Sequence, residues 1–358
     1  MKICYLADGE SVHTRRWCTH FASLGHDVHL ISFKNVQVEG VRVHYIDAGA
    51  ISVKGGNWKV MMKRGAVRRI LREISPDILH AQYATSYGVV GALTGFHPFI
   101  ITALGTDVLI SPQRSKLYRM LIRFALRRAD WVTAMADHMR DAIIALGITP
   151  QKVQTVIFGI DPKIFNRRER FVPQKKFVLT STRNFEPVYN IPLLIDALRM
   201  AAPKIPGMEV NLVGTGTQRE MLEALVKSSA LENIVRFHGK ILQAQIADLL
   251  RGSHLFVSTS LSDGNNVSLN EAMACGAFSI ATDIPANRQW ISEGVNGFLV
   301  PVDRADILAG KILYVYEHYR QLERKAMELN DKLISQYALW EENMKVVEKK
   351  YRELSQKK

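Results

Sequence analysis

The sequence predicts an α/β protein made of two doubly wound domains, each with a parallel sheet covered by helices. The chain has 358 residues, more than a single hydrophobic core usually serves. Short runs of β-branched and apolar residues alternate with amphipathic stretches along its whole length. The segment 161–173 interrupts this alternation with two prolines and a cluster of charges, which is typical of a linker between domains.

The strand candidates follow one another in order on both sides of this linker. Seven lie before it, at residues 2–8, 26–32, 41–47, 77–83, 99–105, 130–136 and 153–159. Six lie after it, at residues 176–182, 208–214, 234–240, 254–260, 277–283 and 297–301. Because helix-prone stretches separate them, a doubly wound sheet is expected in each half.

Composition limits the class of protein. Hydrophobic residues make up 47% of the chain, but no apolar run approaches the roughly 18 residues of a membrane-spanning helix. The first residues, MKICYLADGE, turn polar after one strand-like stretch, so a soluble cytoplasmic protein without a cleaved signal is expected. Cys4, Cys18 and Cys275 fit neither a disulfide framework nor a zinc site, and we expect them to be packing residues.

The positive charge is concentrated in the first half of the chain. Residues 1–170 hold 24 lysines and arginines against 13 acidic residues, whereas residues 171–358 hold 23 against 21. A basic first half indicates an acidic partner, which could be a phosphate-bearing substrate, an anionic membrane or a nucleic acid. Nucleic acid is disfavoured, because no aromatic residues are interleaved with the cations and no helix-turn-helix or zinc pattern is found.

Two predicted helices, at 58–74 and 113–128, carry much of this charge. In the first, Arg64, Arg68, Arg69 and Arg72 fall on one face; in the second, Lys116, Arg119, Arg123 and Arg127 form a stripe. Such helices could lie on an anionic membrane surface. The alternative is that each buries its apolar face on the sheet while its cations stay in water.

The stretch SDGNNVSLNEAMACG at 262–276 carries the strongest chemical signal. It places Asp263 and Glu271 on either side of a turn that leads from a strand into a short helix ending near Gly276. The amides of Gly264, Asn265, Asn266 and Val267 would start that helix and could hold a diphosphate, while the two carboxylates accept hydrogen bonds from sugar hydroxyls. Alternatively, Ser268 and Glu271 form a capping box, and Glu271 only closes its own helix.

The segment from Ser262 to Pro301 resembles the family four retaining glycosyltransferases of the GT-B fold. Their pattern joins an acid and a Glu eight residues later to Ala-Met-Ala-Cys-Gly, a strand ending near Thr-Asp, and a Gly-x-x-Gly-Phe-Leu-Val turn. Glu271, the EAMACG run, Thr282-Asp283 and the segment Glu293–Val300 all match it over about 40 residues. Asp263 stands where a Glu is usual.

The resemblance extends along nearly the whole chain and implies roles for further residues. Arg183 matches the arginine that contacts the diphosphate, but Tyr189 stands where the family usually has a lysine. Either Tyr189 donates a hydrogen bond, another cation compensates, or the leaving group is stabilised less. The remaining implied donor-binding residues are Gly9, Gly214, Gly216 and, against the base, Ile241, whose alternative role is that of an ordinary strand end.

On the acceptor side, His13 matches a histidine that faces the cleft in many members, although a surface helix histidine is also common. Thr106 and Asp107 lie in the loop where many relatives carry His-Gly and this chain reads Leu104-Gly105.

Taken as a whole, the resemblance implies a GT-B protein whose two Rossmann-like domains, at 1–165 and 166–335, face a central cleft. A last helix at about 336–358 is expected to return to the first domain. The implied reaction moves a sugar, with retention, from a UDP- or GDP-linked donor to a hydroxyl of a lipid-linked or cell-surface glycan. Asp263, Glu271 and Arg183 are the expected catalytic residues, with no metal and no cofactor. The location is expected to be cytoplasmic, at the inner face of the cell membrane.

Three alternatives remain open at this point. A nucleotide-sugar epimerase of the same fold would need no acceptor. A catalytically weakened nucleotide-sugar-binding module would explain the departures at Leu104 and Tyr189. A glycoside hydrolase would use the carboxylate pair but needs no phosphate-binding turn between the acids.

Overall fold

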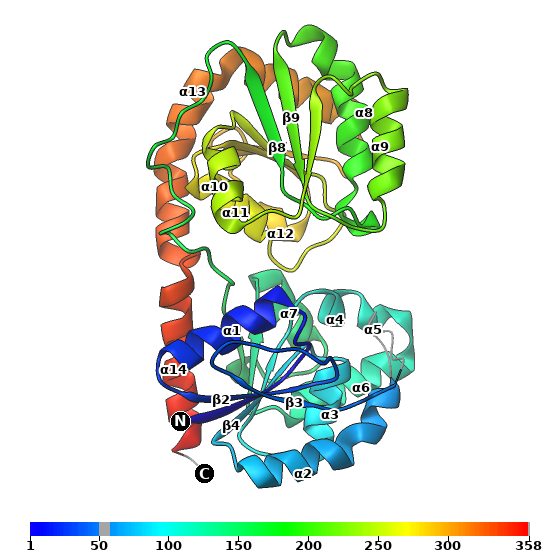
Figure 1. Cartoon of the computed structure of the whole chain (residues 1–358), viewed down its shortest axis with the longest axis vertical. Helices are drawn as coiled ribbons and strands as arrows, with labels where there is room; N and C mark the ends of the chain where they lie inside the picture. Colours follow the sequence, from blue (N-terminus) through cyan, green and yellow to red (C-terminus); the bar gives the residue numbers. More distant parts are fainter. Residues whose placement is uncertain (50–57, 357–358) are drawn as a thin grey trace. The chain divides into compact units, whose positions relative to one another are not determined.

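The computed structural model describes residues 1–49 and 58–356, which form two compact units (Figure 1). Unit 1 comprises Met1–Ile157 together with Met344–Lys358, and unit 2 comprises Phe158–Asn343. Unit 1 therefore ends before residue 165, where the sequence led us to expect the boundary. The chain passes back from unit 2 to unit 1 within helix α14 (Trp340–Ser355), after a short break that follows α13 (Ala305–Tyr337).

Unit 1 is built on a seven-stranded parallel sheet in the order β3-β2-β1-β4-β5-β6-β7. Its strands are β1 (Lys2–Leu6), β2 (Asp27–Ser32), β3 (Arg42–Tyr45), β4 (Ile78–Gln82), β5 (Phe99–Thr102), β6 (Trp131–Ala134) and β7 (Val153–Thr155). Its helices include α1 (Val12–Ser23), α2 (Arg64–Ile74), α3 (Ser86–Thr94), α4 (Thr106–Leu109), α5 (Ser111–Arg114), α6 (Lys116–Arg128) and α7 (Asp137–Ala145).

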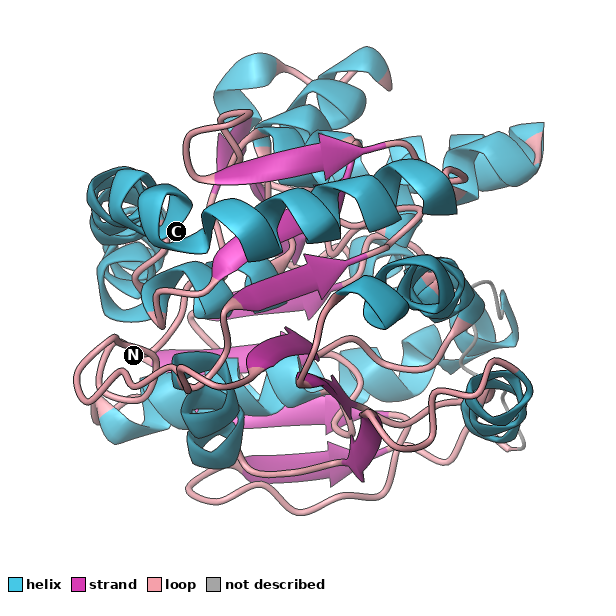
Figure 2. Cartoon of the chain, turned by 90° about the horizontal axis from the view of Figure 1, so that it is seen from above, coloured by secondary structure: helices cyan, strands magenta, loops and turns pink. Residues whose placement is uncertain are grey.

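Unit 2 is built on a six-stranded parallel sheet in the order β10-β9-β8-β11-β12-β13. Its strands are β8 (Phe177–Ser181), β9 (Met208–Val213), β10 (Val235–Gly239), β11 (Leu255–Ser258), β12 (Phe278–Thr282) and β13 (Gly297–Val300). Its helices are α8 (Ile191–Ala201), α9 (Arg219–Ser228), α10 (Gln243–Arg251), α11 (Val267–Ala274), α12 (Pro285–Arg288) and α13. Helices flank strands in Figure 2.

Every strand predicted from the sequence is present, so the prediction of two doubly wound parallel sheets is confirmed. The strands could be predicted because most of them are buried along their length and are therefore apolar runs in the sequence. In β8 and β12, for example, every residue is buried. The three cysteines are buried free thiols, in agreement with a packing role. Among the described residues, no helix is both long and apolar enough to cross a bilayer.

The strand order places a ligand-binding edge in each sheet. In both sheets the order reverses beside the first strand of the unit, between β1 and β4 in unit 1 and between β8 and β11 in unit 2. Loops from two neighbouring strands diverge at such a reversal and leave a crevice at the carboxyl ends of the strands, where open α/β sheets bind ligands.

The two basic helices differ from the prediction in their boundaries. Residues 58–63 form a 3-10 turn, and the α-helix begins only at Arg64. The second segment is interrupted at Ser115, which has an extended backbone and whose side chain accepts a hydrogen bond from the amide of Tyr118. Ser115 therefore caps a new helix, α6, and ends α5, which explains why the segment is not continuous.

The tail of the chain is fixed to unit 1 by both apolar and polar contacts. Met344, Val347 and Tyr351, predicted to share one side of the last helix, are all fully buried. The hydroxyl of Tyr351 is hydrogen-bonded to Nδ1 of His80 and lies 3.2 Å from the hydroxyl of Tyr5. From Met344 onward, helix α14 is therefore an integral part of unit 1.

Candidate functional site

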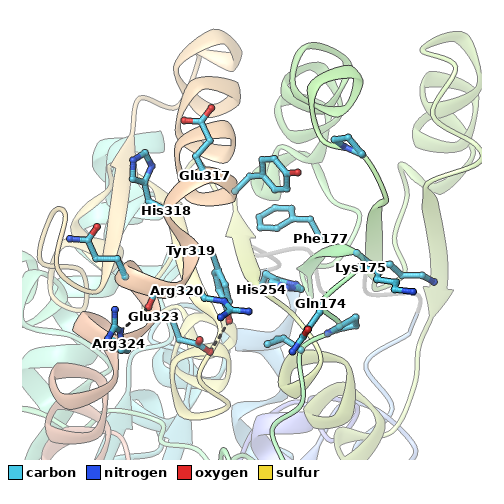
Figure 3. A pocket seen from close by; sticks show the side chains of 16 residues that line it. Gln174, Lys175, Phe177, His254, Glu317, His318, Tyr319, Arg320, Glu323 and Arg324 are labelled. Atoms are coloured by element: carbon cyan, nitrogen blue, oxygen red, sulfur yellow. Dashed lines mark hydrogen bonds between the residues drawn. The ribbon is translucent and has the colours of Figure 1, made fainter.

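A pocket of about 1060 Å³ lies in unit 2 at the amino ends of the strands (Figure 3). It is formed by residues 172–177 and by α13, with Phe177, His254 and Tyr319 on its inner wall. These groups are already engaged: the amide of Val178 donates to Nδ1 of His254, and burial, together with the nearby Arg170, lowers the pKa of His254 to about 4. Ligands of open α/β sheets bind at the opposite edge, at the carboxyl ends of the strands, where the turn after β11 lies.

The turn after β11 is organised by Asn266. Its side-chain oxygen accepts a hydrogen bond from the amide of Leu269 at 3.2 Å, so Asn266 is the residue that caps α11. Ser268 lies inside the helix, and the capping box of Ser268 and Glu271 considered above is therefore wrong. The helix ends with Gly276 at a φ of +83°, where the amides of Gly276 and Ala277 bond back to Met273 and Ala272.

This geometry leaves backbone donors at the start of α11. Within the described part of the chain, the amides of Gly264, Asn265 and Asn266 have no backbone acceptor. The amide of Val267, in contrast, donates to the carbonyl of Asn265 at 3.0 Å. The predicted cradle is therefore one residue shorter than the sequence indicated, with its free backbone donors at the residues that lead into α11.

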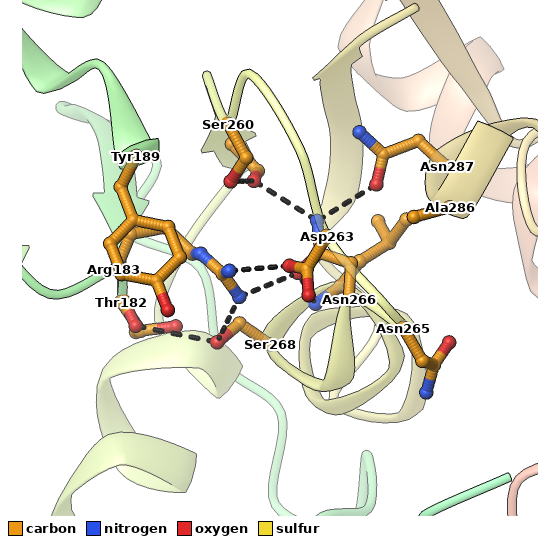
Figure 4. Close-up of polar contacts among 12 residues, drawn as sticks. Thr182, Arg183, Tyr189, Ser260, Asp263, Asn265, Asn266, Ser268, Ala286 and Asn287 are labelled. Carbon is orange, nitrogen blue, oxygen red and sulfur yellow. Dashed lines mark hydrogen bonds and ion pairs between the residues drawn. The ribbon is translucent and has the colours of Figure 1, made fainter. Parts of the chain in front are cut away.

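Arg183, in the loop after β8, reaches across to this turn (Figure 4). Its Nη2 lies 2.5 Å from Oδ2 of Asp263, and its Nη1 donates to Oδ1 of Asn266 at 3.0 Å and to Oγ of Ser268 at 3.4 Å. The residue is only 7% exposed. Its Nε finds no acceptor within the described residues, so a buried guanidinium at the sheet reversal keeps unused donor capacity.

Tyr189 lies on the face of the same guanidinium. The centre of its ring is 4.3 Å from Cζ of Arg183, within the range of a cation–π contact. Tyr189 ends a 3-10 turn, Pro187–Tyr189, between β8 and α8. The structure thus brings together Arg183, Tyr189, Asp263 and the cap of α11, which were predicted as separate motifs.

Glu271 belongs to the same group by its position on the helix. It follows Ser268 by three residues and so lies on the helix face that meets Arg183. The side chain is half-buried.

Several residues that support this site were not predicted. Nδ2 of Asn266 donates to Ser258 at 3.0 Å and to Oδ1 of Asn287 at 2.9 Å. Oδ1 of Asn265 accepts from Nε1 of Trp290 at 2.8 Å. Asn287 and Trp290 lie in the segment quoted for its family resemblance, but nothing in their sequence positions indicates that they brace the turn.

The second glycine loop contacts the loop of Arg183 directly. A Cβ at Gly214 would lie 2.6 Å from the carbonyl oxygen of Arg183, and one at Gly216 would lie 2.4 Å from that of Phe185. The amide of Phe185 donates to the carbonyl of Thr215 at 2.9 Å. Glycine is required because two main chains touch here. Ile241, in contrast, follows the edge strand β10, two strand positions or about 10 Å from β8.

The residues predicted in unit 1 follow strands β1 and β5, at the carboxyl ends of its sheet. The amide of Gly9 donates to Oγ of Ser32 at 3.1 Å, and a Cβ there would lie 2.3 Å from Val36. Gly9 therefore packs against the loop after β2, and its amide is already used. His13 is an exposed residue in the first turn of α1.

Asp107 is a structural carboxylate in this structure. It is fully buried and accepts hydrogen bonds from the amides of Ala84 at 2.7 Å, Gly105 at 2.9 Å and Leu104 at 3.1 Å. Burial raises its pKa, and the amide bonds partly oppose this shift. The carboxylate therefore ties the loops after β4 and β5 together, and its predicted place beside an acceptor stays a prediction. Its exposed neighbour Thr106 is hydrogen-bonded to the hydroxyl of Tyr83 at 2.5 Å.

Metal-ligating side chains do not cluster here. Among the described residues, no group of three or more His, Cys, Asp or Glu side chains could hold a metal ion.

Both halves of the chain match known protein families. Residues 2–136 match the family described as Glycosyl transferase 4-like, and residues 162–333 match Glycosyl transferases group 1. The N-acetyl-alpha-D-glucosaminyl L-malate synthase of Bacillus anthracis is 26% identical over 88% of this chain and 89% of its own length.

Among solved structures, sucrose-phosphate synthase from Thermosynechococcus elongatus is similar over 100% of both chains, with a TM-score of 0.86 and 18% identity. HepE from Anabaena, solved in complex with UDP, is similar over 99% of this chain and 100% of its own, with a TM-score of 0.79 and 20% identity. These structures support the GT-B fold. With both halves of the sequence matched in chain order, the protein belongs to the group 1 glycosyltransferases of the GT-B fold.

Proposed function

We propose that this glycosyltransferase binds the diphosphate of a UDP- or GDP-linked sugar between Arg183 and the amides of Gly264 to Asn266, and transfers the sugar with retention to a hydroxyl. The observation that carries the proposal is the buried guanidinium of Arg183, which keeps an unused donor beside three amides without backbone acceptors. An anion with several oxygens, such as a diphosphate, supplies acceptors to both sets of donors at once.

The chemistry then depends on stabilising charge rather than on a strong base. As the bond to the diphosphate breaks, negative charge grows on the leaving oxygens, where fixed amide and guanidinium donors are most effective. Asp263, held beside Arg183, accepts hydrogen bonds from hydroxyls of the donor sugar. Glu271 binds the ribose or the edge of the sugar. Among relatives, HepE was solved with UDP and with UDP-glucose, which makes a UDP-linked sugar the first donor to test.

The test begins with a panel of UDP- and GDP-sugars, scored first for binding by thermal shift and then for nucleotide release with membrane extract. We expect one donor to release its nucleotide only when acceptor is present, and the product to keep the anomeric configuration by NMR. Arg183→Met, Asp263→Asn and Glu271→Gln should each lower turnover strongly while the protein stays folded. Wild-type turnover in all three variants would refute the site.

The same panel separates the alternative functions. An epimerase would convert the donor into its epimer without acceptor. A binding module would be stabilised by the nucleotide sugar but would never release the nucleotide, whatever acceptor is supplied.

We further propose that the acceptor is a lipid-linked or cell-surface glycan, reached at an anionic membrane through α6. Three large apolar side chains of this helix are exposed: Leu117 at 43%, Met120 at 60% and Phe124 at 37%. Their spacing places them on one helix face, and exposed basic residues of the same helix, among them Lys116, Arg119 and Arg127, flank them. Such a face suits the interface of an anionic bilayer, where each cation contributes about 1 kcal/mol.

Helix α2 supports this proposal less. Its apolar residues Val67, Ile70 and Leu71 are buried on unit 1, and Arg68 donates to the carbonyls of Leu93 and Thr94. The two helices can be compared by co-sedimentation with vesicles that contain or lack anionic lipid. We expect Met120→Ser with Leu117→Ser to weaken binding to anionic vesicles and Arg72→Gln on α2 to change it little. Equal binding to neutral vesicles would remove the membrane proposal and leave the donor site unaffected.

A further inference from the structure

The residue at position 189 departs from the family pattern, and the structure indicates what it does instead. The 3-10 turn Pro187–Tyr189 carries the tyrosine under the guanidinium of Arg183, with 4.3 Å between the ring centre and Cζ. A lysine in this position would bring a second positive charge toward Arg183. An aromatic ring attracts the guanidinium instead, because its face is negative.

The turn that carries Tyr189 is braced against the end of β11. Oγ1 of Thr259 donates to the carbonyl of Tyr189 at 2.9 Å, and the amide of Leu261 donates to the carbonyl of Val188 at 2.8 Å. The next residue, Asn190, adopts a φ of +47° and donates from Nδ2 to the carbonyl of Val302 at 3.0 Å. The backbone that carries the ring is therefore held in place by contacts that do not involve Arg183.

Arg183 is consequently held from two directions. Asp263, Asn266 and Ser268 fix the edge of the guanidinium through hydrogen bonds, and Tyr189 supports its face. When a diphosphate competes with Asp263 for the guanidinium, the edge contacts change, whereas the contact with the ring does not depend on them. The planar guanidinium of Arg183 can lie flat on the ring of Tyr189, which is a contact that the ammonium group of a lysine cannot make.

We propose that Tyr189 is a positioning residue that holds Arg183 in place for the diphosphate through its ring and supplies neither a charge nor a hydrogen bond to the ligand. The inference rests on the proposed function, since it takes Arg183 as the diphosphate ligand. In the proposed site, a single cation, Arg183, lies on an aromatic ring, where the family usually has an arginine and a lysine.

The experiment compares four substitutions in the full chain, with UDP binding measured by calorimetry and donor kinetics by nucleotide release. Tyr189→Leu should weaken UDP binding and lower kcat/KM for the donor by about tenfold, because the guanidinium loses its support. Tyr189→Phe keeps the ring and should lose less than about threefold. Tyr189→Lys should be no better than Tyr189→Leu. Tyr337→Leu, at an exposed tyrosine at the end of α13, is the matched control.

A direct readout comes from the NMR signal of the Arg183 Nε–Hε group in the ligand-free protein. The ring shifts this signal, so it should move in Tyr189→Leu and stay near its wild-type position in Tyr189→Phe. A loss in Tyr189→Phe as large as in Tyr189→Leu would show that the hydroxyl matters and overturn the proposal. A gain in Tyr189→Lys over Tyr189→Phe would overturn it too, by showing that the position needs a cation.

Arg183→Met separates this inference from the proposed function. If Arg183→Met binds UDP as tightly as the wild type, the proposed donor site is wrong. If Arg183→Met loses UDP binding while Tyr189→Leu keeps it, the donor site stands and only the positioning role of Tyr189 is refuted.

Discussion

Replacing Arg170 by methionine should unfold unit 2 at markedly lower denaturant, although the residue lies in the predicted linker. Its side chain is only 8% exposed. Nε lies 3.0 Å from Oε1 of Glu323 on α13, and Nη2 donates to the hydroxyl of Tyr319 at 2.6 Å. Nη1 donates to the carbonyls of Arg251 at 2.9 Å and Cys275 at 3.2 Å.

The loss in the free energy of unfolding can be estimated from the groups that lose their partner when Arg170 is replaced by methionine. The two carbonyls belong to the ends of α10 and α11, so one cation caps two helices at the ends where the helix dipole is negative. Methionine has a similar length but no donor, and the carboxylate of Glu323 then stays nearly buried without its cation. Removing one partner of such a pair costs about 3–5 kcal/mol, a large part of the 5–15 kcal/mol that stabilises a typical domain.

The assay is hydrogen exchange of peptides from α10 and α11 in increasing urea, which reports unit 2 separately from unit 1. Arg199→Met, at an exposed position on α8, is the control and should change stability by less than about 0.5 kcal/mol. Arg170→Lys should fall between the two, because lysine keeps the charge but cannot reach both helix ends with a planar fork. If Arg170→Met matches the control, the contacts of Arg170 do not stabilise unit 2 and the reasoning is wrong.

Contacts of Gly214, Tyr351 and His80 can be tested by substitution in the same way. Gly214→Ala places a Cβ 2.6 Å from the carbonyl oxygen of Arg183 at a φ of +149°, so it should displace that loop and weaken UDP binding by calorimetry about tenfold; unchanged affinity would mean that the two loops are not coupled. Tyr351→Phe removes the hydroxyl that bonds to His80 and should destabilise unit 1 by about 1–3 kcal/mol in urea unfolding. Burial lowers the pKa of His80 from its usual 6.5 to about 3, so the unfolded chain binds a proton that the folded chain excludes. The stability of unit 1 should therefore fall as the pH drops below about 6.5, by about 2 kcal/mol from His80 alone between pH 7 and pH 5, and His80→Gln should reduce that slope.

The sequence was sufficient for the sheets because their signal is local. The run from Phe278 to Thr282 is apolar or β-branched throughout, apart from one serine, and a buried parallel strand is the structure that suits such a run. The break at Ser115, in the helix predicted at 113–128, was not predicted because a serine in a basic amphipathic stretch looks like any other polar residue on the exposed face. Only its extended backbone and its bond to Tyr118 show that it begins a helix.

The site was predictable as a set of loops but not as a set of contacts. Arg183 and Asp263 were singled out separately, 80 residues apart in sequence, and their 2.5 Å contact depends on β8 and β11 being neighbours in the sheet. The interpretation of Tyr189 was left open for the same reason. Asp107 was placed on the acceptor side because its loop resembles one in the family, and the three amides that it accepts from come from loops that the sequence does not bring together.

Helix α11 joins the stability of unit 2 to its chemistry, because it is fixed at both ends. At its start, Asn266 binds Ser258 and Asn287, and at its end Arg170 binds the carbonyl of Cys275. The amides proposed to hold the diphosphate are therefore oriented before any ligand arrives, which is the condition under which fixed dipoles stabilise a transition state most. Under conditions where unit 2 stays folded, Arg170→Met should therefore lower kcat as well as stability. This effect is expected even though Arg170 lies at the opposite end of α11 from the site.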